Sequence, residues 1–378
     1  MSAAKIPPDP RSTDDPAAAG GGAGETDQRD RILRLPEDHV GPVEKRTRKT
    51  WVFEGGSMAH REVTYVPGLH KIFDEVLLHA ADNKRRDATM DSLRVEVDAA
   101  RCCVSVYYNG RGVPIELHDP EQHGVYAPEM VYGGGHLANR HEAQIAGVKL
   151  ANVFSTEFVN MGKKSEPQIT VCLQGGNWTR ITFKPDLAKF NMTRIDDDAI
   201  ALMRKRVVDM VAFVGTTVQV VSNGQRIHGA KSFSSYVFAY LKAASKERGE
   251  VPERICERPV NNDQWEVFAT TQGGTHVDYV ADQIAARIAK ICREDFQVEE
   301  SEVKRHLWVF VNAVMENPSF DSPTRDALIT PQESFGSSCE LSEQFIDNVY
   351  ECIIVGELSP PCPWNRSYKD SKAKKRKL

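Results

Sequence analysis

Three polar side chains in residues 67–83, PGLHKIFDEVLLHAADN, recur at every fourth position: Glu75, His79 and Asn83. In a helix, residues four apart lie one turn above another on the same face, with side chains about 6 Å apart. A carboxylate beside an imidazole and an amide forms a small polar site with side chains of the kinds that bind ligands. Three polar residues taken alone nevertheless favour a plainer interpretation, a solvated helix face, so the decision depends on the surrounding sequence.

A helix must position Glu75, His79 and Asn83, which we call the polar stripe. Pro67 and Gly68 end the extended run EVTYV, and apolar residues then follow at steps of three and four. This spacing predicts one buried helix face over residues 67–83. Alternating apolar residues at 51–66 around Gly55 and Gly56 predict a hairpin before the helix, and residues 93–97 and 103–108 predict two strands after it.

Composition sets limits on the class of protein. The chain has 378 residues, of which 40% are hydrophobic and 27% charged, enough for two ordinary domains. Its formal charge of -5 argues against a globally basic surface that would coat nucleic acid. The basic clusters at 84–86 and 204–206 fit solvated helix ends. No stretch resembles a signal peptide or a membrane span, so we expect an intracellular protein without a membrane partner.

Six blocks of the sequence resemble the ATPase region of eukaryotic type II DNA topoisomerase, a member of the GHKL ATPases, and they occur in the family's order. The blocks are residues 33–44, 63–87, 149–158, 181–190, 273–283 and 308–321. The resemblance spans residues 31–356. It implies an α/β (α+β) fold, in which a GHKL-type sandwich of mixed sheet and helices is followed by a transducer-like α/β domain.

The resemblance and the composition together predict four segments. Residues 1–30, rich in Pro, Ala, Gly and Asp, are expected to form a disordered tail. A GHKL ATPase-like domain is expected at 31–190 and a transducer-like domain at 191–356, the latter with a shortened sheet. The tail at 357–378 ends in KDSKAKKRKL, which in a nuclear family resembles a localisation signal, although a solvated tail explains it as well. We expect the family's DNA-cleavage core to be absent.

In the family, the helix stripe handles ATP and Mg²⁺. Glu75 matches the general base, and Asn83 matches a residue that could bond phosphate or ribose groups. His79 stands where the family has an asparagine whose amide oxygen binds Mg²⁺. Because Mg²⁺ prefers hard oxygen ligands, an imidazole is a poor substitute at the metal position.

The family's two nucleotide loops are altered as well. Tyr108 stands where an acidic or amide side chain reads adenine, ahead of the retained turn residues Asn109, Gly110 and Gly112, and a shift of one residue would put Asn109 there instead. The phosphate lid aligns with residues 142–149, where Gly147 and Lys149 remain. The earlier lid glycines are replaced by residues with Cβ atoms, and Glu142 adds a negative charge.

The transducer's catalytic Gln-Thr-Lys loop is here Pro323, Thr324 and Arg325, which keeps a cation but not a compact ammonium group. Together these departures predict a degenerate ATPase module. One hypothesis is a non-catalytic or weakly active module that pairs with itself or with a full-length type II topoisomerase and meets DNA only indirectly. The other is a working ATP-hydrolysing subunit or fragment. The sequence leaves open whether the chain is an enzyme; we expect it to be nuclear and unable to pass DNA strands alone.

Overall fold

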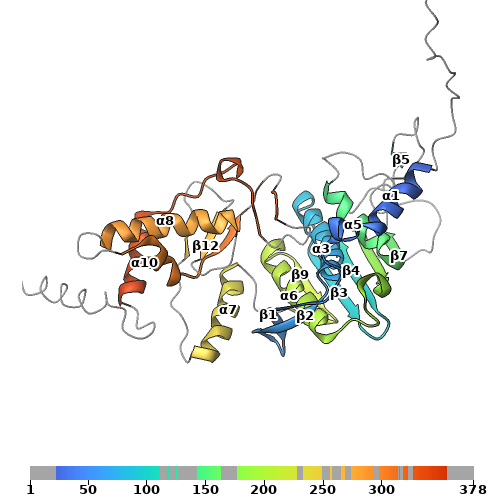
Figure 1. Cartoon of the computed structure of the whole chain (residues 1–378), viewed down its shortest axis with the longest axis horizontal. Coiled ribbons are helices and arrows are strands. Elements are labelled where there is room, and N and C mark those ends of the chain that lie inside the picture. The colour runs from blue at the N-terminus through green and yellow to red at the C-terminus, as the bar shows by residue number, and fades with distance from the viewer. Residues whose placement is uncertain are drawn as a thin grey trace, which may run out of the picture.

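The computed structural model describes most of the chain between residues 23 and 355. The described ranges are 23–110, 117–118, 125–126, 143–162, 177–227, 233–248, 256–257, 265–268, 274–292, 298–313, 315, 318–321 and 327–355. Within them, helices and strands alternate along the chain and gather around two hydrophobic cores (Figure 1).

A six-stranded mixed sheet forms the centre of the first core. Its strand order is β10-β9-β3-β4-β8-β7. The bounds are β3 Ser92–Asp98, β4 Cys103–Asn109, β7 Ser155–Gly162, β8 Trp178–Pro185, β9 Gln219–Ser222 and β10 Gln225–Arg226. All neighbouring strands are antiparallel except β3 and β9, which are parallel. The mixed sheet with its helices confirms the predicted fold class.

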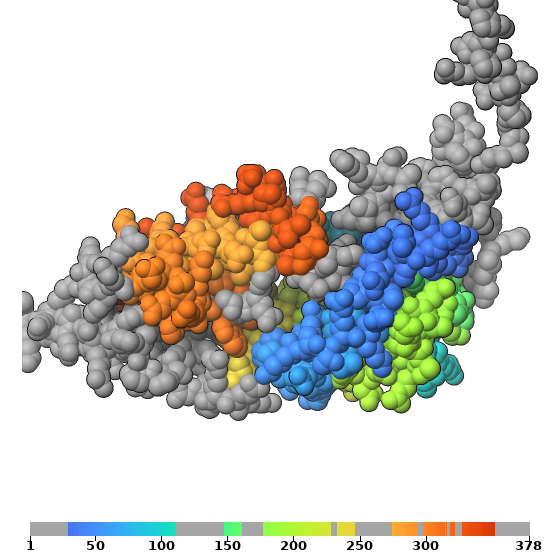
Figure 2. Space-filling model, viewed as in Figure 1, coloured from blue at the N-terminus to red at the C-terminus, as the bar shows by residue number. Residues whose placement is uncertain are grey.

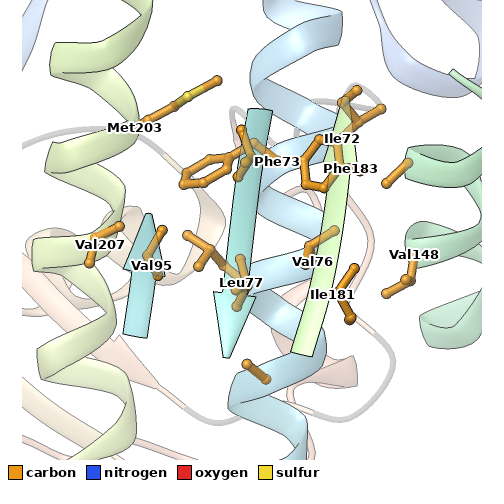
Figure 3. Close-up of a cluster of buried hydrophobic side chains, with 14 of the residues drawn as sticks. Ile72, Phe73, Val76, Leu77, Val95, Val148, Ile181, Phe183, Met203 and Val207 are labelled. Carbon is orange, nitrogen blue, oxygen red and sulfur yellow. The ribbon is translucent and has the colours of Figure 1, made fainter. Parts of the chain in front are cut away.

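Three helices cover one face of this sheet: α3 (Pro67–Arg86), α5 (Ala143–Val153) and α6 (Asp197–Val214). Figure 3 shows how they meet the strands: Val207 of α6 lies beside Val95 of β3, Val148 of α5 lies near Ile181 of β8, and Phe73 and Leu77 of α3 lie between these two pairs. Each fully buried large apolar side chain contributes about 1.5 to 3 kcal/mol to stability. The helix predicted at 67–83 is confirmed, and it ends at Arg86.

The predicted hairpin before α3 is also confirmed. Strands β1 (Arg46–Glu54) and β2 (Ser57–Tyr65) pair antiparallel, and Gly55 and Gly56 both adopt positive φ at the turn. Met58 of this hairpin packs against Tyr240 of helix α7 (Phe233–Arg248). Figure 2 shows the blue hairpin surface next to the yellow surface of α7. The hairpin therefore packs against α7, the helix that comes after the six-stranded sheet in the chain.

The first sheet continues beyond residue 190, where the sequence suggests a domain boundary. Helix α6 contributes Met203 and Val207 to the first core, and β9 pairs with β3. Because β9 lies far from β3 in the sequence, the alternation of apolar and polar residues within each strand does not reveal that the two strands pair. The first core therefore includes residues of α6 and β9, which follow residue 190. At the N-terminal end, helix α1 (Ala23–Arg34) begins within the segment expected to be a tail. Its residue Ile32 is buried in the first core, which holds this helix against the protein.

The second core gathers the later elements. Helix α8 (Thr275–Cys292) packs with a three-stranded sheet and two further helices. Their bounds are β11 Cys256–Glu257, β12 Trp265–Phe268, β13 Phe310–Ala313, α9 Glu300–Arg305 and α10 Glu343–Val355.

The remaining described elements are short. They are α2 Glu37–Val40, β5 Leu117–His118, β6 Val125–Tyr126, and the 3-10 turns η2 Leu187–Phe190 and η3 Gln332–Ser334. The N-terminal tail through residue 22 and the basic tail at 357–378 lie outside the described residues. Within the described part of the chain, no helix is both long and apolar enough to cross a membrane.

Candidate functional site

Helix α3 carries the polar stripe into the protein. Glu75, His79 and Asn83 keep only 4%, 6% and 3% of their surface exposed. A solvated helix face would leave such side chains in water. The structure therefore rules out the plainer interpretation and makes the stripe a buried polar site.

Glu75 lies against two neighbours. Lys71, one turn earlier on α3, forms a buried ion pair with its carboxylate. Helix α5 covers the other side at Gly147, where an added Cβ would lie 1.7 Å from Oε2 of Glu75. Only glycine leaves room for this approach, so the backbone of α5 rests directly on the carboxylate.

Gly147 is placed differently from the prediction. The sequence suggests a loop running to Gly147, but α5 begins at Ala143 and includes it. The Ala and Gln residues before Gly147 are good helix formers, and Val148 and Ala151 are buried against α3. Lys149 lies on the same helix with 4% exposure. In an α-helix the amide of Gly147 bonds to the carbonyl four residues earlier.

His79 faces the ring of Tyr108. Its imidazole centroid lies 6.1 Å from that of Tyr108, with the rings inclined at 68°. Burial, with a smaller contribution from the charge of Arg86, lowers the pKa of His79 to about 4. The imidazole is therefore neutral at physiological pH.

Tyr108 belongs to the first hydrophobic core, with 1% of its surface exposed. Its neighbour Asn109 points to the opposite face of β4. The Asn109 side chain accepts hydrogen bonds from the backbone amides of Asp91 (3.0 Å) and Ser92 (2.9 Å), and donates one to the Asp91 carboxylate (2.7 Å). The alternative register, with Asn109 in place of Tyr108, is therefore wrong.

Asn83 connects α3 to the turn after β4. Its Nδ2 donates to the backbone oxygen of Asn109 (3.2 Å) and contacts the Met90 sulfur at 3.6 Å. Gly110 follows with φ of +104°, and a Cβ there would lie 2.8 Å from the Asp87 carboxylate. Asn83 and Gly110 thus fix the geometry of the turn.

Sequence reasoning missed a second polar cluster on the opposite side of α3, which we name the α6 network. Asp74 binds Arg206 of α6, and Asp209 of α6 binds Lys205 (2.7 Å) and lies 3.8 Å from Arg206. From α7, the Tyr236 hydroxyl donates to Asp209 (2.9 Å). The interpretation of 204–206 as a solvated helix end is wrong for Lys205 and Arg206, whose side chains are 25% and 17% exposed. The sequence feature that could have revealed this network is the four-residue spacing of Lys205 and Asp209, which places the two charges side by side on a helix.

Electrostatics within the α6 network favour the paired state. Burial by itself would raise the pKa of Asp74, but the charge and hydrogen bond of Arg206 lower it below its ordinary value. Burial and then the charge of Asp209 raise the pKa of Tyr236 well above its ordinary value, so the phenol keeps the proton that it donates.

Three predicted site residues, Gly112, Thr324 and Arg325, lie outside the described residues. Glu75, His79, Asn83, Tyr108, Gly110, Gly147 and Lys149 are all buried or half-buried around α3. Among the described residues, no cluster of three or more His, Cys, Asp or Glu side chains could hold a metal ion.

Comparisons with known proteins agree with this architecture. Residues 266–352 match the family model described as DNA gyrase B. DNA topoisomerase 2 of Arabidopsis thaliana is 44% identical over 395 aligned residues, which cover 90% of this chain and 26% of that protein. The enzyme of Pisum sativum is 42% identical, with 88% and 26% covered. The chain therefore spans about a quarter of the length of these relatives.

Solved structures match over nearly their whole length. The ATPase region of Saccharomyces cerevisiae topoisomerase II aligns with a TM-score of 0.74 at 32% identity, covering 86% of this chain and 96% of that one. The ATPase and transducer domains of DNA topoisomerase II from Balamuthia mandrillaris align with a TM-score of 0.75 at 32% identity, covering 86% and 93%. This chain belongs to the family of type II DNA topoisomerase ATPase regions.

Proposed function

We propose that the chain is a dimerisation or regulatory module of the type II topoisomerase family whose nucleotide site is degenerate and has little or no ATPase activity. The observation that carries the proposal is the contact between His79 and Tyr108, whose rings lie 6.1 Å apart inside the protein. These are the two positions that the resemblance assigns to Mg²⁺ and adenine. The neutral imidazole offers nitrogen where the family has a hard oxygen ligand, and the Tyr108 phenol takes the place of the smaller acidic or amide acceptor that reads adenine.

The donor set around α3 does not fit Mg²⁺. His79 offers nitrogen, one oxygen of the Glu75 carboxylate is paired with Lys71, and Asn83 donates its amide nitrogen to the Asn109 carbonyl. Mg²⁺ requires near-octahedral oxygen coordination and keeps several of its waters. We therefore assign no catalytic step to Mg²⁺ in this chain.

The segment around Gly147, which aligns with the family's phosphate lid, is also poorly suited to bind ATP. With Gly147 inside α5, the amides from Gly147 onward are engaged in helical hydrogen bonds and cannot wrap a triphosphate. Loss of a single oxyanion donor typically costs about 10² to 10³ in rate. Several impaired roles acting together would leave little turnover.

ATP hydrolysis by the purified chain tests the proposal, with Glu75→Ala as the matched control for contaminating ATPase. We expect the two proteins to hydrolyse ATP at the same background rate. Robust turnover that the Glu75 substitution abolishes would contradict the proposal.

We further propose that the module acts by pairing, either with a second copy of itself or with a full-length type II topoisomerase in the nucleus, and that it meets DNA through that partner. Size-exclusion chromatography with and without a nonhydrolysable ATP analogue tests this mode. Pairing that is independent of nucleotide supports it, and a chain that stays monomeric both alone and with the full-length enzyme contradicts it.

A second candidate function is a working ATP-hydrolysing subunit. What favours it is that Glu75, Asn83, Gly110, Gly147 and Lys149 all keep the residue types of the family around α3. Dimerisation that requires nucleotide, together with turnover that depends on Glu75, would support this second candidate.

A further inference from the structure

The face of the six-stranded sheet that points away from α3, α5 and α6 carries a row of aromatic and basic side chains. On β4 the core-facing residues are Val104, Val106 and Tyr108, so Tyr107 points to the other face. Arg94 of β3 and Arg180 of β8 stand directly opposite Tyr107 on either side. We name this row, together with Trp178, the outer-face row.

Contacts within the outer-face row are close. The guanidinium carbons of Arg94 and Arg180 lie 5.2 and 5.6 Å from the centroid of the Tyr107 ring. The Trp178 ring lies 5.8 Å from the Tyr107 ring and is tilted by 33°. Cation–π and ring contacts of this kind hold the four planar groups together on the sheet.

The row is partly exposed and carries two arginines, with the exposed Glu96 two residues from Arg94 on the same face of β3. Arg94 and Arg180 are exposed, while Tyr107 and Trp178 are half-buried. In the part of the chain that the structure describes, neither arginine takes part in an ion pair. Along the same face Glu157 is bound by Lys184 at 2.5 Å, so that carboxylate is already neutralised.

We propose that the outer-face row binds single-stranded DNA. Planar aromatic and guanidinium groups on an open sheet face stack with unpaired bases, and the arginine charges attract the phosphates. A duplex keeps its bases stacked inside, so it could use only the charges. The side-chain hydroxyls beside the row, Ser105 and Thr182, hydrogen-bond each other at 3.1 Å, so only one of their two protons is left to donate to a ribose 2′-hydroxyl. This inference goes beyond the proposed function, because it adds a direct contact with unpaired DNA to the contact that the module makes through its partner. It does not depend on the nucleotide site.

Fluorescence anisotropy of the full chain with a labelled oligo-dT of about 20 nucleotides, longer than typical single-strand sites, tests the proposal. The wild type should bind oligo-dT more tightly than a duplex of the same length, and no less tightly than oligo-U. Tyr107→Leu and Trp178→Leu should each weaken binding about tenfold, since a base–aromatic stack has about this effect. The double variant R94Q/R180Q should weaken binding and flatten its salt dependence.

Two controls separate recognition from folding. Tyr107→Phe keeps the ring and should bind like the wild type. Arg226→Gln removes an exposed arginine from edge strand β10 of the same sheet and should change the affinity little. Thermal melts verify that each variant folds. The proposal is overturned if the wild type does not bind, if duplex or oligo-U binds more tightly than oligo-dT, or if a folded Tyr107→Leu variant binds oligo-dT as the wild type does.

Discussion

Helix α3 presents two polar surfaces of opposite character. Toward α5 and β4 it carries Glu75, His79 and Asn83, where an imidazole meets a tyrosine ring in the protein core. Toward α6 it carries Asp74, whose charge is matched by Arg206. The α6 network is built from paired buried charges, whereas the stripe combines one ion pair with a neutral imidazole and an amide.

The comparison teaches that scaffold and chemistry can separate on a single helix. Burial of Asp74 and Arg206 requires a partner for each, so neither can change alone without cost. His79 is neutral and packs against the Tyr108 ring, so it adds no unpaired charge. A neutral side chain of the stripe can therefore be exchanged at less cost than a member of the buried ion pair.

The largest expected effect comes from breaking the α6 network. Arg206→Met removes the partner of Asp74 and leaves a buried carboxylate, so we expect a loss of about 3 to 5 kcal/mol in the free energy of unfolding. Urea denaturation measures it. Arg204→Met, an exposed position on the same helix, is the matched control and should change stability by less than about 0.5 kcal/mol. Equal stability of the two variants would show that the network is not structural.

A second test concerns the contact between α5 and the stripe. Gly147→Ala places a methyl group on the Glu75 carboxylate, so we expect a loss of about 2 to 3 kcal/mol, as for overpacking in a core. Shortening Glu75 to Ala in the same chain removes the clash and should restore part of the loss. If the single Gly147→Ala variant melts at the wild-type temperature, α5 does not rest on Glu75.

The buried histidine predicts acid sensitivity. With its pKa lowered from 6.5 to about 4, His79 stays neutral in the folded protein while the unfolded chain takes up a proton. Its contribution to stability is complete above pH 6.5 and is lost as the pH falls toward 4, by about 2 kcal/mol at pH 5. Urea denaturation at pH 7 and pH 5 should show a smaller drop for His79→Asn than for the wild type. An identical drop would mean that His79 is not buried as described.

The smallest effect is expected at the outer end of the α6 network. Tyr236→Phe removes the hydroxyl that donates to Asp209, and a hydrogen bond to a charged group contributes about 1.5 kcal/mol or more. Denaturant unfolding measures the change, and the Arg206→Met variant serves as reference. If Tyr236→Phe lowers the free energy of unfolding as much as Arg206→Met does, then α7 stabilises the first core by more than this single hydrogen bond.

Much of the fold could be predicted from local patterns. The spacing of Ile72, Phe73 and Val76 predicts α3, and the alternation in β1 to β4 predicts two hairpins. The parallel pairing of β9 with β3 could not be predicted, because its partners are far apart in sequence.

The candidate site could be predicted as a set of residues but not as an arrangement. The stripe of Glu75, His79 and Asn83 follows from helical periodicity. That Gly147 lies inside a helix depends on how α5 packs against α3, and the partner of Asp74 depends on α6, which follows more than 120 residues later in the chain. Such tertiary contacts override the local signals.

Binding of a nonhydrolysable ATP analogue with Mg²⁺ tests the central claim most directly. Isothermal titration of the folded chain should show no saturable binding in the wild type, because His79 and Tyr108 fill the positions of the metal ligand and the adenine contact. Saturable, Mg²⁺-dependent binding that is lost in Glu75→Ala or Gly147→Ala would contradict the account.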